Sequence, residues 1–247
     1  MALSLGVGTC GLGMILIVGQ PALPLADEVD EAALREQCRR LHEALANLGD
    51  PFPGETGRQL QALLQCPADP QATIKFQRLL DSHCLVGVHI NPESRVKALR
   101  GPRPAELVHN RPVFVLLKVV NEAGITAPLN IGGPQLLGRP KARADAWLEA
   151  DVVTAKPLAP TLTGQRLDYV VVRLIARQRG KREATLQFDA GQGTQDLGFR
   201  AEVPVLFQVR EGPEAFGDAQ GRRRLWTTAD ASYNVPARIR DKLKGCR

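Results

Sequence analysis

The chain is poor in aromatic residues, which make up only 4% of its 247 residues. Because Phe, Tyr and Trp bury the most surface per side chain, the core has to be built mainly from Val, Leu, Ile and Ala. The 18 prolines and 23 glycines indicate many turns, but they lack the period of collagen and the abundance of a disordered chain. A chain of this length, 44% hydrophobic, holds one large domain or two small ones.

Motifs of the common catalytic and metal sites are also absent. The chain contains no His-x-His, no His-Glu-x-x-His, no paired-cysteine spacing and no Gly-x-Ser-x-Gly, which are patterns of zinc sites and serine hydrolases. Gly191–Thr194 looks like a phosphate loop, but it lacks the Gly-Lys-Ser/Thr ending and leads into no helix. The sequence therefore predicts no catalytic residue and no cofactor.

One small-ligand candidate lies in the Gly-rich turn after residue 188. Asp189 and Asp196 flank this turn, and their carboxylate oxygens are suitable ligands for calcium. Their spacing does not match the calcium loop of helix–loop–helix proteins. These two aspartates are the metal-site candidate that the sequence offers.

The first 26 residues resemble an export signal. Residues 3–18 carry no charge, two prolines follow this apolar run, and acidic residues begin at Asp27. A short apolar run, a proline break and a small residue at the boundary predict secretion with cleavage after Ala26. The first five residues contain no Lys or Arg, so an uncleaved N-terminal membrane anchor is the alternative. We expect an exported protein, periplasmic or secreted.

Residues 27–82 form a predicted helical segment. Apolar residues recur at steps of three and four from Leu34 to Leu48, which is the pattern of one face of an amphipathic helix. The sequence Gly49–Gly54 then breaks the helix, and helical character resumes over residues 55–65 and again over residues 71–80.

Two cysteines of this helical segment suggest a disulfide. Cys38 and Cys66 lie fourteen residues on either side of Phe52, which is the middle of the first break. An antiparallel helical hairpin would bring these positions opposite each other, and an exported chain permits a disulfide. Cys38–Cys66 is therefore a disulfide candidate, and the alternative is two small buried thiols.

Residues 83–210 carry the strand signals. Apolar, β-branched runs occupy residues 84–90, 113–120, 146–154, 169–176, 182–188 and 203–209, separated by Gly, Pro and charged turns. No long helices alternate with these runs, which disfavours a parallel α/β sheet. The sequence predicts a mainly β fold, an immunoglobulin-like or fibronectin-like antiparallel β-sandwich preceded by a short α-helical segment. The Cys…Trp…Cys core of antibody domains is absent.

Residues 211–247 form a basic C-terminal tail. Eight basic and two acidic residues lie between Arg222 and Arg247, so this segment carries the chain's whole net charge of +6. Such a tail can contact polyanions, although no aromatic interleaving or nucleic-acid motif accompanies it, and we expect no specific nucleic-acid binding. The interpretation that we favour is a solvated chain end, and polyanion contact is the alternative. The candidate contacts are Arg222, Arg223, Arg224, Arg238, Arg240, Lys242 and Lys244.

Two runs, His83–Pro102 and Gly180–Phe207, resemble the N-terminal β-rich region of large exported planctomycete proteins of the CehA/McbA metallohydrolase type. In that family a β-rich lead-in precedes a metal-dependent hydrolase domain of the PHP kind. The histidines and carboxylates that hold the metals there have no counterparts in this chain, so no catalytic residue is carried over. The resemblance implies an accessory module, either free-standing or a remnant of a shortened gene.

The sequence favours an exported, non-catalytic β-sandwich module for binding or scaffolding in the cell envelope, with an envelope protein or a polysaccharide as partner. One alternative is an accessory subunit or remnant of a CehA/McbA-type hydrolase, with the catalytic partner encoded nearby. Another is a structural envelope protein whose basic tail binds polyanions.

Overall fold

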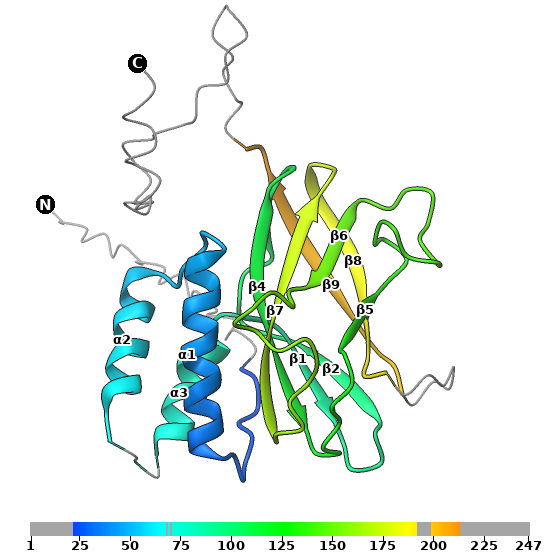
Figure 1. Cartoon of the computed structure of the whole chain (residues 1–247). Helices are drawn as coiled ribbons and strands as arrows, with labels where there is room; N and C mark the ends of the chain where they lie inside the picture. The colour runs from blue at the N-terminus through cyan, green and yellow to red at the C-terminus, as the bar shows by residue number, and fades with distance from the viewer. Residues whose placement is uncertain (1–21, 68, 70, 192–198, 213–247) are drawn as a thin grey trace, which may run out of the picture. The chain divides into compact units, whose positions relative to one another are not determined.

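The computed structural model describes residues 22–67, 69, 71–191 and 199–212. The fold is mainly β, with 36% of the described residues in strands and 21% in helices, and the helices precede the strands in the chain (Figure 1). This confirms the predicted order of a short helical segment followed by a β region. Within the described residues, no helix is both long and apolar enough to cross a membrane.

The helical segment contains α1 (Glu31–Asn47), α2 (Gly54–Gln65) and α3 (Ala72–Asp81), as the periodicity predicts. The carboxylate of Asp30 begins α1, because its Oδ1 accepts a hydrogen bond from Ala33 N at 3.0 Å and so satisfies one free amide of the first turn. The buried residues of α1 follow the predicted apolar stripe: Leu34, Cys38, Leu41, Ala44 and Leu45.

The strands form two sheets. The first has the order β2-β1-β4-β7-β6 and the second the order β3-β9-β8-β5. The first sheet consists of β1 (Cys84–Ile90), β2 (Val96–Arg100), β4 (Pro112–Asn121), β6 (Leu148–Val152) and β7 (Leu167–Ala176). The second consists of β3 (Glu106–Val108), β5 (Asn130–Gly132), β8 (Gly180–Asp189) and β9 (Ala201–Arg210).

The prediction of wholly antiparallel sheets is wrong at two pairs. Strand β1 pairs with β4, and β3 with β9, in parallel. A parallel pair needs a long connection between its strands, and here β2 and β3 lie in the chain between β1 and β4. The sequence pattern missed the edge strands β2, β3 and β5, because strands of three to five residues give no long apolar run.

Strand β4 shows how the core is divided. Its alternate residues Val115, Leu117 and Val119 face the core between the two sheets. The residues between them face the other way, and Phe114 and Leu116 pack against the helices. Because successive side chains point to opposite faces of a strand, a strand covered on both faces reads as a continuous apolar run. The helices therefore cover the outer face of the first sheet.

The segment before α1 belongs to this helix-covered core. The side chain of Leu23 is 6% exposed and packs within it. The carbonyl of Pro24 accepts a hydrogen bond from Lys118 Nζ at 2.8 Å, and the backbone of Ala26 makes two hydrogen bonds with the side chain of Gln77 in α3. Cleavage at the predicted site after Ala26 would remove all of these contacts.

Candidate functional site

The two cysteines of the predicted disulfide are free thiols in the structure. Cys38 is fully buried on the inner face of α1, whereas Cys66 is exposed at the C-terminal end of α2. Burial raises the pKa of Cys38 to about 12, against a smaller lowering by Arg35. A disulfide also needs side chains that point toward each other, and in this structure one of the two thiols is buried while the other is exposed.

The calcium candidate is only partly within the described residues, because Asp196 lies outside them. Asp189 uses its Oδ1 within the protein, where it accepts hydrogen bonds from Asn130 Nδ2 at 2.7 Å and from Gly191 N at 3.3 Å. In the part of the chain that the structure describes, no group of three His, Cys, Asp or Glu residues is placed to hold a metal ion. The polyanion candidates Arg222 to Lys244 also lie outside the described residues.

A buried polar cluster connects the helices to the first sheet. Lys118 Nζ in β4 forms an ion pair with Asp81 Oδ2 at 2.7 Å and donates to Gln77 Oε1 at 2.9 Å. The hydroxyl of Tyr169, the register neighbour of Lys118 on β7, donates to Asp81 Oδ1 at 2.8 Å. Burial raises the pKa of Asp81, and its hydrogen bonds from Lys118 and Tyr169 oppose that rise. Each polar group here has a partner, so the cluster holds α3 on the sheet.

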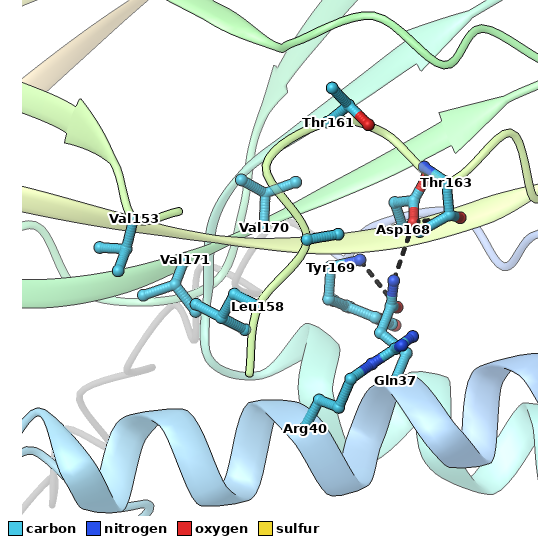
Figure 2. Close-up of a pocket in the computed structure, with 11 residues that line it drawn as sticks. Gln37, Arg40, Val153, Leu158, Thr161, Thr163, Asp168, Tyr169, Val170 and Val171 are labelled. Carbon is cyan, nitrogen blue, oxygen red and sulfur yellow. Dashed lines mark hydrogen bonds between the residues drawn. The ribbon is translucent and has the colours of Figure 1, made fainter. Parts of the chain in front are cut away.

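A second polar contact joins α1 to the same sheet (Figure 2). Gln37 Nε2 donates to Asp168 Oδ1 at 2.8 Å, and Gln37 Oε1 accepts from Tyr169 N at 2.9 Å. Thr163 supplies two more hydrogen bonds to the Asp168 carboxylate, and burial raises the pKa of that carboxyl. The cavity beside these residues has a volume of only about 30 Å³, which is room for a water molecule.

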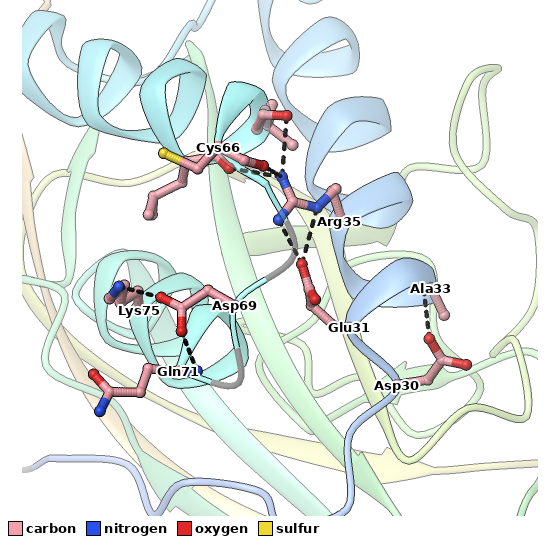
Figure 3. Close-up of polar contacts among 10 residues, drawn as sticks. Asp30, Glu31, Ala33, Arg35, Cys66, Asp69, Gln71 and Lys75 are labelled. Carbon is pink, nitrogen blue, oxygen red and sulfur yellow. Dashed lines mark hydrogen bonds and ion pairs between the residues drawn. The ribbon is translucent and has the colours of Figure 1, made fainter.

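Arg35 fixes the position of α2 (Figure 3). Its Nη1 lies 2.8 Å from Leu63 O, 3.1 Å from Leu64 O and 2.9 Å from Cys66 O. A cation at these carbonyls satisfies the free acceptors at the C-terminal end of a helix and complements its dipole. The other side of the guanidinium contacts Glu31, one turn earlier in α1. Helix α2 is thereby anchored to α1 at one end.

A groove lies between α2 and α3, with a volume of about 650 Å³. Leu63 and Leu79 contribute apolar surface to it, while Lys75 and Arg78 contribute positive charge. None of its described lining residues is acidic, although Lys75 pairs with the nearby Asp69 (Figure 3). We name this the α2–α3 groove; it is lined by Thr56, Gln59, Ala62, Leu63, Cys66, Lys75, Arg78, Leu79 and Ser82.

A second hollow, with a volume of about 320 Å³, lies where three loops meet beside the first sheet. Its walls include Phe52 and Phe114, and its polar residues include Asp50, His83 and Arg103. We name this the Arg103 cavity. His83 Nε2 lies 3.0 Å from Thr56 Oγ1, and its ring packs edge-on against Phe52 with 5.4 Å between the ring centroids. Burial and the nearby Arg103 charge lower the pKa of His83.

Sequence patterns did not identify this cavity. Asp50 belongs to the proline-containing break between α1 and α2, and Arg103 lies between Pro102 and Pro104, so both were expected only as loop residues. A charged residue held between prolines has a restricted backbone, and this is the local signal that could have marked Arg103. No spacing in the sequence relates it to His83, because the two meet only through the fold.

No protein-family model matches this sequence, and no curated protein matches it.

Proposed function

We propose that the protein is an exported, non-catalytic binding module of the cell envelope. In this proposal its two sheets form an immunoglobulin-like or fibronectin-like sandwich, and its helical layer carries the partner-binding surface. The supporting observation is the α2–α3 groove, which combines apolar surface from Leu63 and Leu79 with the cations Lys75 and Arg78. Grooves of this composition suit an amphipathic helix that lays its apolar face between two helices.

Charge complementarity favours an acidic partner. Arg78 has no ion-pair partner among the described residues, and no acidic residue is part of the groove lining that the structure describes. Opposite charges across an interface steer association and reject wrongly charged partners. We therefore propose an acidic amphipathic segment of an envelope protein as the ligand of the groove.

The buried polar groups support a binding role over a catalytic one. Lys118, Asp81 and Tyr169 satisfy one another, and Asp168 is held by Gln37 and Thr163. Groups that act in proton transfer have to reach a substrate, whereas the side chains of these clusters are directed at one another. The resemblance to CehA/McbA-type metallohydrolases suggests a first partner to test, a metal-dependent hydrolase encoded by a neighbouring gene.

Site-specific crosslinking in the native cell tests this proposal. A photo-crosslinking residue replaces Gln59 or Arg78 in the groove, and Arg58, which is exposed on α2 but does not line the groove, serves as the matched control position. We expect the two groove positions to crosslink to one envelope-fraction protein, and we expect Lys75→Glu/Arg78→Glu to reduce the product formed from position 59 at least about tenfold. The proposal would be contradicted if position 58 crosslinked equally well or if the product were a polysaccharide. Recovery of the chain in the cytoplasm would also contradict it.

A further inference from the structure

The guanidinium of Arg103 has no hydrogen-bond or ion-pair partner among the described residues, although its backbone is held firmly. Arg103 N donates to Cys84 O at 3.1 Å, and Arg103 O accepts a hydrogen bond from the side chain of Arg100. Pro102 and Pro104 restrict the chain on either side. The backbone that carries this side chain into the cavity is therefore fixed before any ligand arrives.

The Arg103 residue is half-buried, in the wall of the cavity. Burial lowers the pKa of Arg103, and the charge of Asp50 opposes this only in part. Removing a charge from water without giving it hydrogen bonds is costly. A bound anion would supply those hydrogen bonds, and the planar fork of a guanidinium matches the two oxygens of a carboxylate.

The walls of the Arg103 cavity indicate the chemistry of the rest of the ligand. Phe52 and Phe114 offer aromatic surface, which favours a ligand with an apolar body. Asp50 lies in the same cavity, and its negative charge disfavours ligands that carry two charges, such as phosphate at neutral pH. The volume of about 320 Å³ is at the small end of ligand pockets.

We propose that the Arg103 cavity binds a small monocarboxylic acid with an apolar body. The carboxylate lies on the guanidinium of Arg103, and the body packs against Phe52 and Phe114. This site is separate from the partner groove proposed above, because the lining residues of the two hollows have only Ser82 in common.

Calorimetric titration of the full chain with benzoate tests the proposal. Benzamide is the matched neutral control, since it keeps the ring and loses the charge, and inorganic phosphate tests for general anion binding. We expect saturable benzoate binding at least about tenfold tighter than that of either control, because a charge-assisted bidentate pair is worth about that much or more. Benzamide or phosphate binding as tightly as benzoate would overturn the proposal, as would the absence of saturable benzoate binding.

Two variants assign the binding to the cavity. Arg103→Gln should weaken benzoate binding at least about tenfold, while Arg95→Gln, which removes an exposed arginine from the turn at the far end of the β1–β2 hairpin, should leave it unchanged. If Arg103→Gln does not fold, Arg103→Lys keeps the charge and loses the fork, and it should still bind benzoate more weakly than the native chain. Unchanged affinity in the folded Arg103 variant would overturn the assignment.

Discussion

Lys118 in β4 and Asp81 at the end of α3 form an ion pair with 2.7 Å between Nζ and Oδ2, and their side chains are only 2% and 10% exposed. This pair joins the helical layer to the first sheet. The same lysine donates to the carbonyl of Pro24, so it also holds the segment before α1. One buried cation in β4 thus contacts two other parts of the chain, α3 and the segment before α1, both of which lie far from it in sequence.

Replacing Lys118 by methionine should lower the free energy of unfolding by about 3–5 kcal/mol, because Asp81 would be left buried without its cation. Urea denaturation measures this loss, and Lys97→Met, at an exposed position of β2, is the control and should change stability by less than about 0.5 kcal/mol. Adding Asp81→Leu to Lys118→Met should recover part of the loss, since the uncompensated charge is then gone. A loss below about 1 kcal/mol for Lys118→Met would mean that the pair is not buried as described.

Leu23 should behave as a core residue although it precedes the first helix. Its side chain is 6% exposed, and a Cβ on Gly87 would lie 2.7 Å from its Cδ2. We expect Leu23→Ala to cost about 2–4 kcal/mol of unfolding free energy. Leu25→Ala, at a side chain that is 39% exposed, is the matched control and should cost less than about 1 kcal/mol.

Removal of residues 1–26 should destabilise the chain more than removal of residues 1–21. The longer deletion takes away Leu23, the carbonyl of Pro24 and both hydrogen bonds between Ala26 and Gln77. We expect the longer deletion to melt at a temperature several degrees lower, since about 1 kcal/mol corresponds to a few degrees for a domain of this size. Equal melting temperatures would show that this segment does not support the fold, and would fit cleavage after Ala26.

His83 should make stability depend on pH. Burial and the charge of Arg103 lower its pKa below the ordinary value of 6.5; the other polar groups around it are Asp50 and the hydroxyls of Thr56 and Ser82. The unfolded chain therefore takes up a proton as the pH falls through about 6.5, while the folded chain does not until lower pH. The free energy of unfolding is therefore higher above about pH 6.5 and decreases as the pH falls below this value.

Urea denaturation between pH 7.5 and pH 5 checks this dependence. His83→Gln should lose less stability over this range than the native chain, because the residue that takes up the proton is gone. Arg103→Gln should give an intermediate result, since removing the cation raises the pKa of His83 toward its ordinary value. The same pH dependence in all three chains would show that His83 does not contribute.

Cysteine reactivity distinguishes the free thiols from the predicted disulfide. In a Cys10→Ser/Cys246→Ser background, Cys66 should react with a maleimide in the folded chain because it is exposed. Cys38 and Cys84 should react only after unfolding, because burial keeps them from the reagent and raises the pKa of both thiols. A chain in which Cys84 alone reacts when it is unfolded without reductant would instead contain the Cys38–Cys66 bond.

The local elements could be predicted because local patterns specify them. The stripe from Leu34 to Leu48 predicts α1, and the proline-containing break and the later leucines predict α2 and α3. The long strands β4, β7, β8 and β9 were predicted as well, since each shows a run of apolar residues or a regular alternation. The short edge strands could not be predicted, because their pairing comes from neighbours distant in the chain.

By itself, the sequence determined a short helical segment followed by a β region, with a core built from aliphatic residues. It also showed Lys118 inside an apolar run, without showing which partner would accept its charge. Only the tertiary structure decided that Asp81 meets this lysine and Tyr169, that Cys38 is buried while Cys66 is exposed, and that Arg103 joins His83 and Phe52 around one cavity. The physical reason is that secondary structure follows from local periodicity, whereas contacts between distant residues depend on how sheets and helices pack.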